Sequence, residues 1–351
     1  MDTHADKIIE EERIVNEIKS HLDRMYIPTL RIVMTSACNG ECFFCHREGA
    51  SHYKKNTLQM RLNIIENQIL PAINAIGINK VIFTGGEPTL HDGIATAIRM
   101  IKTGNKNVQV GITTNGLNIG RIFDVKDYID RITISSSSLK EEIFMHYTKV
   151  NPLELVNNLR SFNKAKKSVS IVITKENANE LGEMIDFYMC NGFDIKLQFI
   201  ISDLEMNNIN WQQEILYRLM ELYGEFDVKL GATPVLCKEV NGNEIRIKLA
   251  SLNAWMYDNL FIKNICMQCE KKAECIERGC AVRVFPDGKV TPCLSQFKSF
   301  SSNNVFANLE KAYRSLEIGN IEFSNSLANC KLAQNKSNIY LIKELIKNTT
   351  A

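Results

Sequence analysis

Short apolar runs alternate with amphipathic stretches from residue 29 to residue 200. Six runs rich in β-branched residues have the length and composition of buried strands. These runs are residues 29–35, 80–86, 108–114, 131–137, 168–174 and 194–200. The stretches between them have helical patterns, such as 58–77 and 177–192, and the second closes with Asn191-Gly192, a typical helix stop.

This alternation predicts an α/β fold with either an open sheet or a partial barrel. Strands that are each followed by a helix pair in parallel through right-handed crossovers. In such folds the functional residues lie at the carboxyl ends of the strands. The motifs CNGECFFC, GGEP, TTNG and a serine run follow the first four strands, so we expect these motifs to meet at one end of the sheet.

The pattern changes on either side of this region. Residues 8–25 place apolar side chains at steps typical of an amphipathic helix, which packs on the main body or binds a partner. Near residue 225 the alternation stops, and a cysteine-rich segment with a hairpin-like piece, EVNGNEIRIKL, follows. We therefore predict an N-terminal helix over 1–27, a core over 28–225 and a small C-terminal domain over 226–351.

The composition is that of a globular protein. A chain of 351 residues with 45% hydrophobic residues can bury a large core. Lys and Arg total 42 against 40 Asp and Glu, a formal charge of +2, so no field of one sign indicates nucleic acid or an anionic membrane as the partner. The charged N-terminal segment and the lack of a run of about 18 apolar residues predict a soluble cytoplasmic protein.

The eleven cysteines are the most informative part of the composition, because most of them are clustered. In a reducing compartment, clustered cysteines bind metal or perform redox chemistry more often than they form disulfides. Three cysteines lie within residues 38–45 and five within residues 266–293. The remaining three are expected to be ordinary residues: Cys190 on the apolar face of a predicted helix, Cys237, and Cys330 in a polar tail.

The first group, Cys38, Cys42 and Cys45, allows three interpretations. Zinc needs four ligands, and His46 is a conceivable fourth. Cys42 and Cys45 also form a C-x-x-C pair, as in thioredoxin-like redox proteins. The third interpretation is a 4Fe–4S cluster, since C-x3-C-x2-C is one compact loop that can hold three irons and leave the fourth open for a substrate or cofactor.

The GGEP motif at the end of the second predicted strand has two interpretations. It can be a simple turn, or it can form part of a ligand site. Gly85 and Gly86 leave backbone groups open to close approach, and Glu87 can accept a hydrogen bond from a cationic amino group.

The cysteine loop after the first strand, combined with GGEP after the second, resembles the radical SAM superfamily. The resemblance implies a partial (β/α)6 TIM-like barrel in which the open iron chelates S-adenosylmethionine. It further implies that Cys38, Cys42 and Cys45 hold the cluster, that Phe44 packs on adenine, and that a flavodoxin- or ferredoxin-type protein donates electrons.

Within that superfamily the chain resembles the GTP 3′,8-cyclases of molybdenum cofactor biosynthesis. The resemblance rests on LRIVMTSACNGECFFC, FTGGEPTLH, TTNGL, RITISSSSL and IVITKENANELGEMIDFYMCNG. It implies that Thr114 and Ser135 contact S-adenosylmethionine, while Asn115 is expected to be a turn residue. Arg31 matches an arginine that binds the cyclases' nucleotide substrate, or it pairs with an internal carboxylate. Ala37 and His91-Asp92 depart from the cyclase pattern, so we do not expect GTP cyclisation itself.

The second cysteine group can form either a zinc-ribbon-like knob or an auxiliary 4Fe–4S cluster. Its members are Cys266, Cys269, Cys275, Cys280 and Cys293. The spacing resembles SPASM and twitch domains, with Cys237 as the one candidate for a further upstream cysteine. Pro286-Asp287-Gly288 is predicted to be a hairpin turn that returns Cys293 to the others. We expect four of the five thiols to bind one auxiliary cluster.

The resemblance implies an enzyme that cleaves S-adenosylmethionine reductively and abstracts hydrogen from its substrate. The expected substrate is a small polar molecule such as a nucleotide or a sugar; a ribosomal peptide, matured by a SPASM-type enzyme, is the alternative. A zinc-binding nucleic-acid module is a third, remote interpretation. Residues 46–55, directly after Cys45, are expected to lie close to the open iron.

Overall fold

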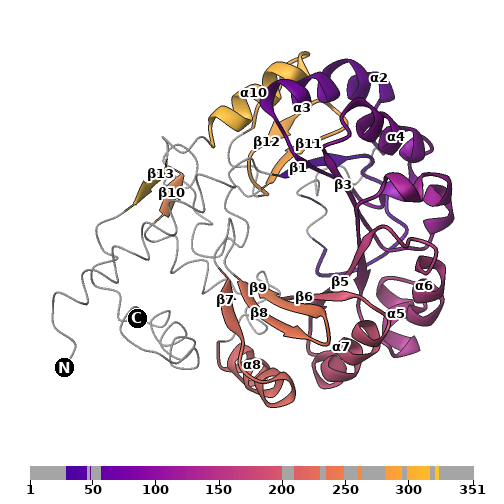
Figure 1. The fold of residues 1–351 in the computed structure, drawn as a ribbon, viewed down its shortest axis with the longest axis vertical. Coiled ribbons are helices and arrows are strands. Elements are labelled where there is room, and N and C mark those ends of the chain that lie inside the picture. Colours follow the sequence, from indigo (N-terminus) through magenta and orange to yellow (C-terminus); the bar gives the residue numbers. More distant parts are fainter. Residues whose placement is uncertain are drawn as a thin grey trace. The chain divides into compact units, whose positions relative to one another are not determined.

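The computed structural model describes residues 29–45, 48, 57–199, 209–229, 235–248, 260–262, 281–294, 299–316 and 321–323. The chain forms two compact units. One comprises residues 27–197 and 279–314, and the other comprises residues 1–26, 198–278 and 315–351 (Figure 1). The predicted helix over 1–27 lies outside the described residues, as do Cys266, Cys269, Cys275, Cys280 and Cys330.

The first unit contains all six predicted strands, and their ends agree with the prediction to within two residues. The strands are β1 (Thr29–Val33), β2 (Lys80–Thr84), β3 (Gln109–Thr114), β4 (Arg131–Ser136), β5 (Lys166–Ile173) and β6 (Asp194–Phe199). They follow one another in this order across the sheet, and the pairs from β1–β2 to β4–β5 are parallel. The prediction of an α/β fold with a large parallel sheet, compatible with a partial TIM-like barrel, is confirmed.

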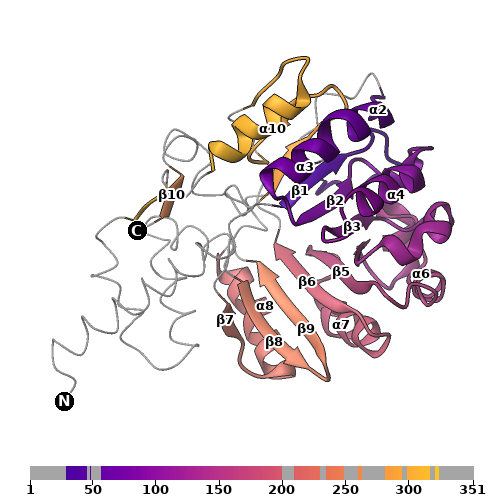
Figure 2. The same ribbon diagram turned by 45° about the horizontal axis from the view of Figure 1, so that its top comes forward.

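Helices connect these strands and cover the outer side of the sheet (Figures 1 and 2). The α-helices are α2 (Leu62–Ile64), α3 (Leu70–Ile76), α4 (Ile94–Gly104), α5 (Glu141–Tyr147), α6 (Pro152–Leu159) and α7 (Leu181–Cys190). A π-helical turn, η2 (Ile65–Ile69), joins α2 to α3, and the 3₁₀ segments are η3 (Pro88–Leu90), η4 (Ile119–Tyr128) and η5 (Ala178–Glu180).

The hydrophobic pattern explains this packing. In β1, the buried Leu30 and Ile32 alternate with the half-buried Arg31, so that one face of the strand is apolar. On the helical side, α4 buries Ile94, Ala97, Ile98 and Ile101, which lie on one face at three- and four-residue steps. Each fully buried isoleucine contributes about 1.5–3 kcal/mol to folding.

The end of α7 confirms one prediction and corrects another. Gly192 has a φ of 78°, and the amide of Phe193 donates to the carbonyl of Tyr188 at 3.1 Å, so Asn191-Gly192 does stop the helix. Cys190 was expected on the apolar face of this helix, but the structure shows it exposed. It is the last residue of α7, and the buried face is formed by residues that include Ile185 and Tyr188.

Residues 281–314 belong to the same compact unit as β1. Strand β11 (Ala281–Val284) pairs in parallel with β1, and β12 (Val290–Thr291) pairs antiparallel with β11. The predicted turn between them is confirmed, with Gly288 at a φ of 83°. Helix α10 (Val305–Arg314) follows, and the amide of Val305 donates to Gln68 Oε1 at 2.7 Å.

Sequence analysis assigned these residues to a domain over 226–351, whereas in the structure β11 lies between β12 and β1 in the sheet. A parallel pairing between strands so distant in the chain has no local sequence signal, which is why the hairpin was recognised and its partner strand was not. The boundary at residue 225 itself stays a prediction.

The second unit contains α8 (Ile209–Tyr223), β7 (Asp227–Lys229), β8 (Val235–Val240), β9 (Asn243–Lys248), β10 (Leu260–Ile262) and β13 (Ile321–Phe323). Strands β8 and β9 form the predicted hairpin, with Asn241 and Gly242 at φ values of 51° and 80°, as a two-residue type I′ turn requires. Within the described part of the chain, no helix is both long and apolar enough to cross a membrane.

Candidate active site

The cysteine loop follows β1 and is fixed by backbone contacts. The amide of Glu41 donates to the carbonyl of Tyr147 at 3.0 Å, and the amide of Cys45 donates to the carbonyl of Cys42 at 3.2 Å. Cys38 and Cys45 are exposed and Cys42 is half-buried. The structure therefore holds all three thiols on one short loop at the carboxyl end of the first strand.

The thiols affect one another electrostatically. Burial, together with the neighbouring Cys45 and Cys38, raises the pKa of Cys42 to about 12. The pKa of Cys38 is raised as well, by partial desolvation of its thiol and by the nearby Glu87 and Cys45. Thiolates crowded in this way need a positively charged group beside them.

The donor set fits an iron–sulfur cluster. A 4Fe–4S cluster binds each thiolate at a separate iron atom. Three thiols distributed along one loop are compatible with that arrangement.

The two glycines of GGEP lie against the backbone of the cysteine loop. A Cβ on Gly85 would overlap the carbonyl oxygen of Thr35, and a Cβ on Gly86 would overlap that of Ala37. The amide of Gly86 donates to the carbonyl of Thr35 at 2.8 Å, and the amide of Glu87 donates to that of Ala37 at 2.7 Å. Sequence analysis related these glycines to a ligand; the close approach that the structure shows is to the start of the cysteine loop.

Glu87 is the buried centre of this end of the sheet, at 1% exposure. Its Oε1 accepts from the Thr89 amide at 3.0 Å, the Thr89 hydroxyl at 2.5 Å and the Thr114 hydroxyl at 2.7 Å. Its Oε2 accepts from the Asn115 amide at 2.7 Å. Burial raises the pKa of Glu87, and these hydrogen bonds oppose that shift. A carboxylate has about four lone-pair sites, so Oε2 retains acceptor capacity.

Two residues of TTNG thus reach the same carboxylate. Thr114, predicted to contact S-adenosylmethionine, donates its hydroxyl to Glu87. Asn115 is the predicted turn residue, because its Oδ1 accepts from the Leu117 amide at 3.0 Å. Its Nδ2 also donates to Asn39 Oδ1 at 2.7 Å, a contact with the cysteine loop that sequence analysis did not anticipate.

The remaining predicted cofactor residues are Phe44, in the cysteine loop, and Ser135, in β4. Phe44 is half-buried, with its ring centroid 5.2 Å from that of Phe43 and 6.0 Å from that of Tyr147. Ser135 is half-buried near the end of β4. The next residue, Ser136, accepts a hydrogen bond from the buried Tyr188 hydroxyl at 2.9 Å. The roles of Phe44 and Ser135 toward S-adenosylmethionine stay predictions.

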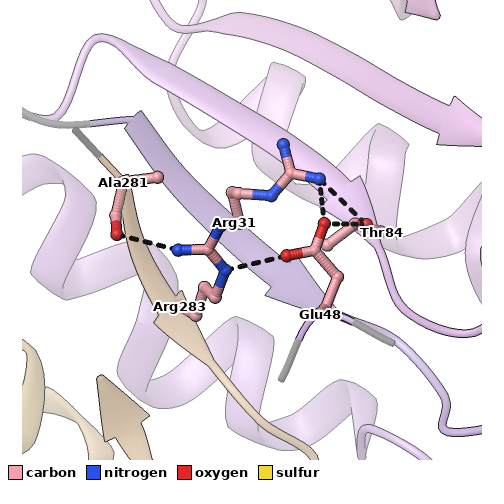
Figure 3. A network of polar contacts seen from close by, with 5 residues as sticks. All are labelled: Arg31, Glu48, Thr84, Ala281 and Arg283. Carbon is pink, nitrogen blue, oxygen red and sulfur yellow. Dashed lines mark hydrogen bonds and ion pairs between the residues drawn. The ribbon is translucent and has the colours of Figure 1, made fainter. Parts of the chain in front are cut away.

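Arg31 has a partner that sequence analysis allowed for in general terms, an internal carboxylate. Its Nη2 donates to Glu48 Oε1 and also to Thr84 Oγ1 at 3.2 Å (Figure 3). The same carboxylate accepts from Thr84 Oγ1 at 3.0 Å and, through Oε2, from Arg283 Nε at 2.8 Å. Arg31 and Arg283 occupy paired positions on the parallel strands β1 and β11.

This network carries two positive charges and one negative charge in a largely buried place. The side chains of Arg283 and Glu48 are 1% and 6% exposed. Arg31 Nε is buried without a hydrogen-bond partner. Sequence analysis placed Glu48 in the segment 46–55 near the open iron without giving it a partner, and it missed Arg283; the other residues of 46–55 lie outside the described residues. The only available signals were the nearness of Glu48 to Cys45 and the isolated charge of Arg283 in an apolar strand.

A comparison with protein families now bears on this site. Residues 32–188 match the model of the Radical SAM superfamily. The chain contains a radical SAM domain. That domain spans β1 to α7 and includes the cysteine loop, GGEP and TTNG, and it identifies the protein as an enzyme. A radical SAM domain implies S-adenosylmethionine and a 4Fe–4S cluster.

Curated relatives of this radical SAM domain are named as GTP 3′,8-cyclases. A probable GTP 3′,8-cyclase of Thermococcus kodakarensis is 32% identical over 201 residues, which is 55% of this chain and 63% of the relative. One from Sulfurisphaera tokodaii is 28% identical over 277 residues, 76% of this chain and 81% of the relative. The match thus spans less than two thirds of the first relative.

Solved structures of one bacterial protein share the fold. Streptococcus suis SuiB bound to the precursor peptide SuiA superposes with a TM-score of 0.57 at 16% identity, covering 95% of this chain and 74% of SuiB. The same protein bound to S-adenosylmethionine gives a TM-score of 0.54 at 17% identity, with the same coverage. At this identity the similarity concerns the fold alone.

Proposed function

We propose that this protein cleaves S-adenosylmethionine reductively and abstracts hydrogen from a small polar substrate. The observation that carries the proposal is the close fit between the two motifs. Gly86 and Glu87 are hydrogen-bonded to the first residues of the cysteine loop, so that a cluster on the loop and an amino group at Glu87 would be neighbours.

The residues of this chain have separable tasks in that reaction. Cys38, Cys42 and Cys45 would hold the cluster, which when bound supplies the electron that releases a 5′-deoxyadenosyl radical from S-adenosylmethionine. Glu87 would accept a hydrogen bond from the amino group at Oε2, where acceptor capacity remains. Thr114 positions that carboxylate through its hydroxyl. Phe44 would pack on adenine, and Ser135 would offer a further hydroxyl.

An auxiliary 4Fe–4S cluster is part of the proposal. Its ligands would be four of Cys266, Cys269, Cys275, Cys280 and Cys293, in a SPASM- or twitch-like segment. Cys293 is buried just after β12, in the unit that contains β1. A flavodoxin- or ferredoxin-type protein is the proposed electron donor.

The polar side chains on one face of the sheet favour a small polar substrate. Thr113, Thr133 and Ser168 occupy paired positions on β3, β4 and β5. The Thr133 and Ser168 hydroxyls are 3.0 Å apart, and Lys196 Nζ donates to Thr133 Oγ1 at 2.9 Å. Hydroxyl groups with a nearby ammonium group suit a hydroxylated metabolite such as a sugar or a nucleoside. The relatives named GTP 3′,8-cyclase point to the same class.

Peptide maturation is the second candidate. It is favoured by the fold similarity to SuiB, a protein solved with its precursor peptide. The two candidates differ in what stimulates cleavage of S-adenosylmethionine, because a bound substrate consumes the radical. The test adds the small-molecule fraction of a cell extract to the protein, with and without prior protease treatment, and measures 5′-deoxyadenosine. We expect the fraction to raise 5′-deoxyadenosine formation even after protease treatment. If protease treatment abolishes the stimulation, the result supports the peptide candidate instead.

The cofactor content tests the enzyme class. We expect about eight irons per chain after anaerobic purification, as for two 4Fe–4S clusters. Replacing Cys45 by Ala is expected to remove about half of that iron, whereas replacing the exposed Cys190 should not change it. Stoichiometric zinc in place of iron would contradict the proposal.

A further inference from the structure

Glu48 follows the first cysteine group, and Arg283 lies within the second group, between Cys280 and Cys293. Glu48 lies three residues after Cys45, the last cysteine of the first group, and Arg283 lies three residues after Cys280 of the second group. Because each residue spans at most about 3.6 Å, Glu48 lies within about 11 Å, between Cα atoms, of Cys45. Arg283 is paired with Thr291 on β12, and Cys293 lies two residues further along the chain. A bond between the two side chains therefore joins the chain just beyond the first group to the hairpin that leads to Cys293.

The structure contains that bond, and it is buried. Arg283 Nε donates to Glu48 Oε2 at 2.8 Å between side chains that are 1% and 6% exposed (Figure 3). The other carboxylate oxygen of Glu48 accepts from Arg31 on β1 and from Thr84 at the end of β2. Four segments thus meet at a single carboxylate.

The charges around Glu48 explain why its carboxylate is needed for stability. Arg31, which is half-buried, and Arg283, which is buried, lie side by side on parallel strands, and their guanidinium groups repel each other unless an anion lies between them. Removing one partner of a buried ion pair leaves an uncompensated charge, which costs far more than an exposed pair contributes. The Glu48 side chain is therefore held firmly, three residues after Cys45 in the sequence.

We propose that the Glu48–Arg283 ion pair is a positioning link between the first cysteine group and the β11–β12 hairpin, which leads to Cys293 of the second group. This inference rests on the proposed function, because it assigns each group a cluster. Neither residue is assigned contact with the reacting atoms; both act through the cysteine segments that they connect. It follows that a change at Arg283, more than 200 residues from the first cysteine group, alters the binding of S-adenosylmethionine there.

The test compares Glu48→Gln, Arg283→Met and the double variant as anaerobically reconstituted full chains. The readouts are iron content and the change in the electron paramagnetic resonance spectrum of the reduced cluster on titration with S-adenosylmethionine. Both single variants are expected to weaken S-adenosylmethionine binding at least tenfold, and the double variant no more than either single one. Arg121→Gln, which removes an exposed ion pair with Asp92, is the matched control and should bind like the wild type.

Arg283→Lys provides the test if the neutral variants do not fold. Lysine keeps the charge but cannot reproduce the Nε donor of a guanidinium group. We expect S-adenosylmethionine binding at least threefold weaker, with circular dichroism unchanged. A folded Arg283→Lys or Arg283→Met variant with wild-type spectrum and affinity would overturn the link.

The outcome for the wild type separates this inference from the proposed function. If wild-type protein shows no cluster signal that depends on Cys45, the proposed function fails. If the signal is present and the Arg283 variants leave it unchanged, only the positioning link fails.

Discussion

Two buried glutamates, Glu87 and Glu48, lie in the same compact unit and are held in opposite ways. Glu87 accepts four hydrogen bonds from uncharged donors, so its negative charge is solvated by the chain but not cancelled by these donors. Glu48 lies between two guanidinium groups, so its surroundings keep a net positive charge. The comparison shows that the neighbours of a glutamate, not its burial, decide whether it can attract a cation.

Glu48→Gln should produce the largest change in stability. Glutamine keeps the size of the side chain but leaves the half-buried Arg31 and the buried Arg283 without their counter-charge, which costs about 3–5 kcal/mol. Urea denaturation of the cluster-free chain, followed by circular dichroism, would measure this loss. If Glu48→Gln lowers the free energy of unfolding by less than Glu87→Gln does, the comparison between the two glutamates is reversed.

Gly86→Ala should be nearly as damaging, for a steric reason. The new Cβ would overlap the backbone carbonyl of Ala37, and overpacking of this kind costs about 3 kcal/mol. Gly120→Ala is the matched control, because a Cβ there meets nothing within 4 Å; its effect should stay within about 0.5 kcal/mol. Equal effects in the same denaturation experiment would show that GGEP does not fix the cysteine loop.

Glu87→Gln should lower the free energy of unfolding by less, about 1–3 kcal/mol, because the donors that lose their acceptor are uncharged. Its effect should also depend on pH. Burial raises the pKa of Glu87 above its ordinary value of 4.5, so the folded state holds the proton more tightly than the unfolded chain. The stability of the wild type relative to Glu87→Gln should therefore be greatest at low pH and fall as the pH rises above 4.5.

The same denaturation experiment, repeated at several pH values, measures that difference. A wild type that gains stability over Glu87→Gln as the pH rises would mean that Glu87 has a cationic partner, and the contrast with Glu48 would disappear.

Arg121→Gln should have the smallest effect. Its ion pair with Asp92 is 2.7 Å long, but both side chains are exposed, so the loss should be at most about 1 kcal/mol. A thermal-denaturation comparison with Glu48→Gln would show how much of the cost at Glu48 comes from burial. A loss as large as that of Glu48→Gln would remove burial as the explanation.

Local patterns predicted most of the fold of the core. The six strands were recognisable because apolar runs of strand length are a property of adjacent residues. The pairing of β11 with β1 was not recognisable, since it joins residues about 250 positions apart. The contact between Glu48 and Arg283 depends on that pairing and was missed for the same reason.

Sequence analysis predicted the residues of the candidate site but not the contacts between them. Glu87, Thr114 and Asn115 belong to two motifs that could be read from the sequence, yet their mutual hydrogen bonds follow only from the parallel pairing of β2 with β3. Gly85 and Gly86 signalled a close approach, but the sequence could not tell whether a ligand or the chain's own backbone would approach them.

The central claim is that the cysteine loop supports reductive cleavage of S-adenosylmethionine. The most direct measurement is the amount of 5′-deoxyadenosine formed from S-adenosylmethionine with a chemical reductant under anaerobic conditions. We predict formation by the wild type and by Cys190→Ala, and none above background by Cys45→Ala. Equal formation by Cys45→Ala and the wild type would contradict the account.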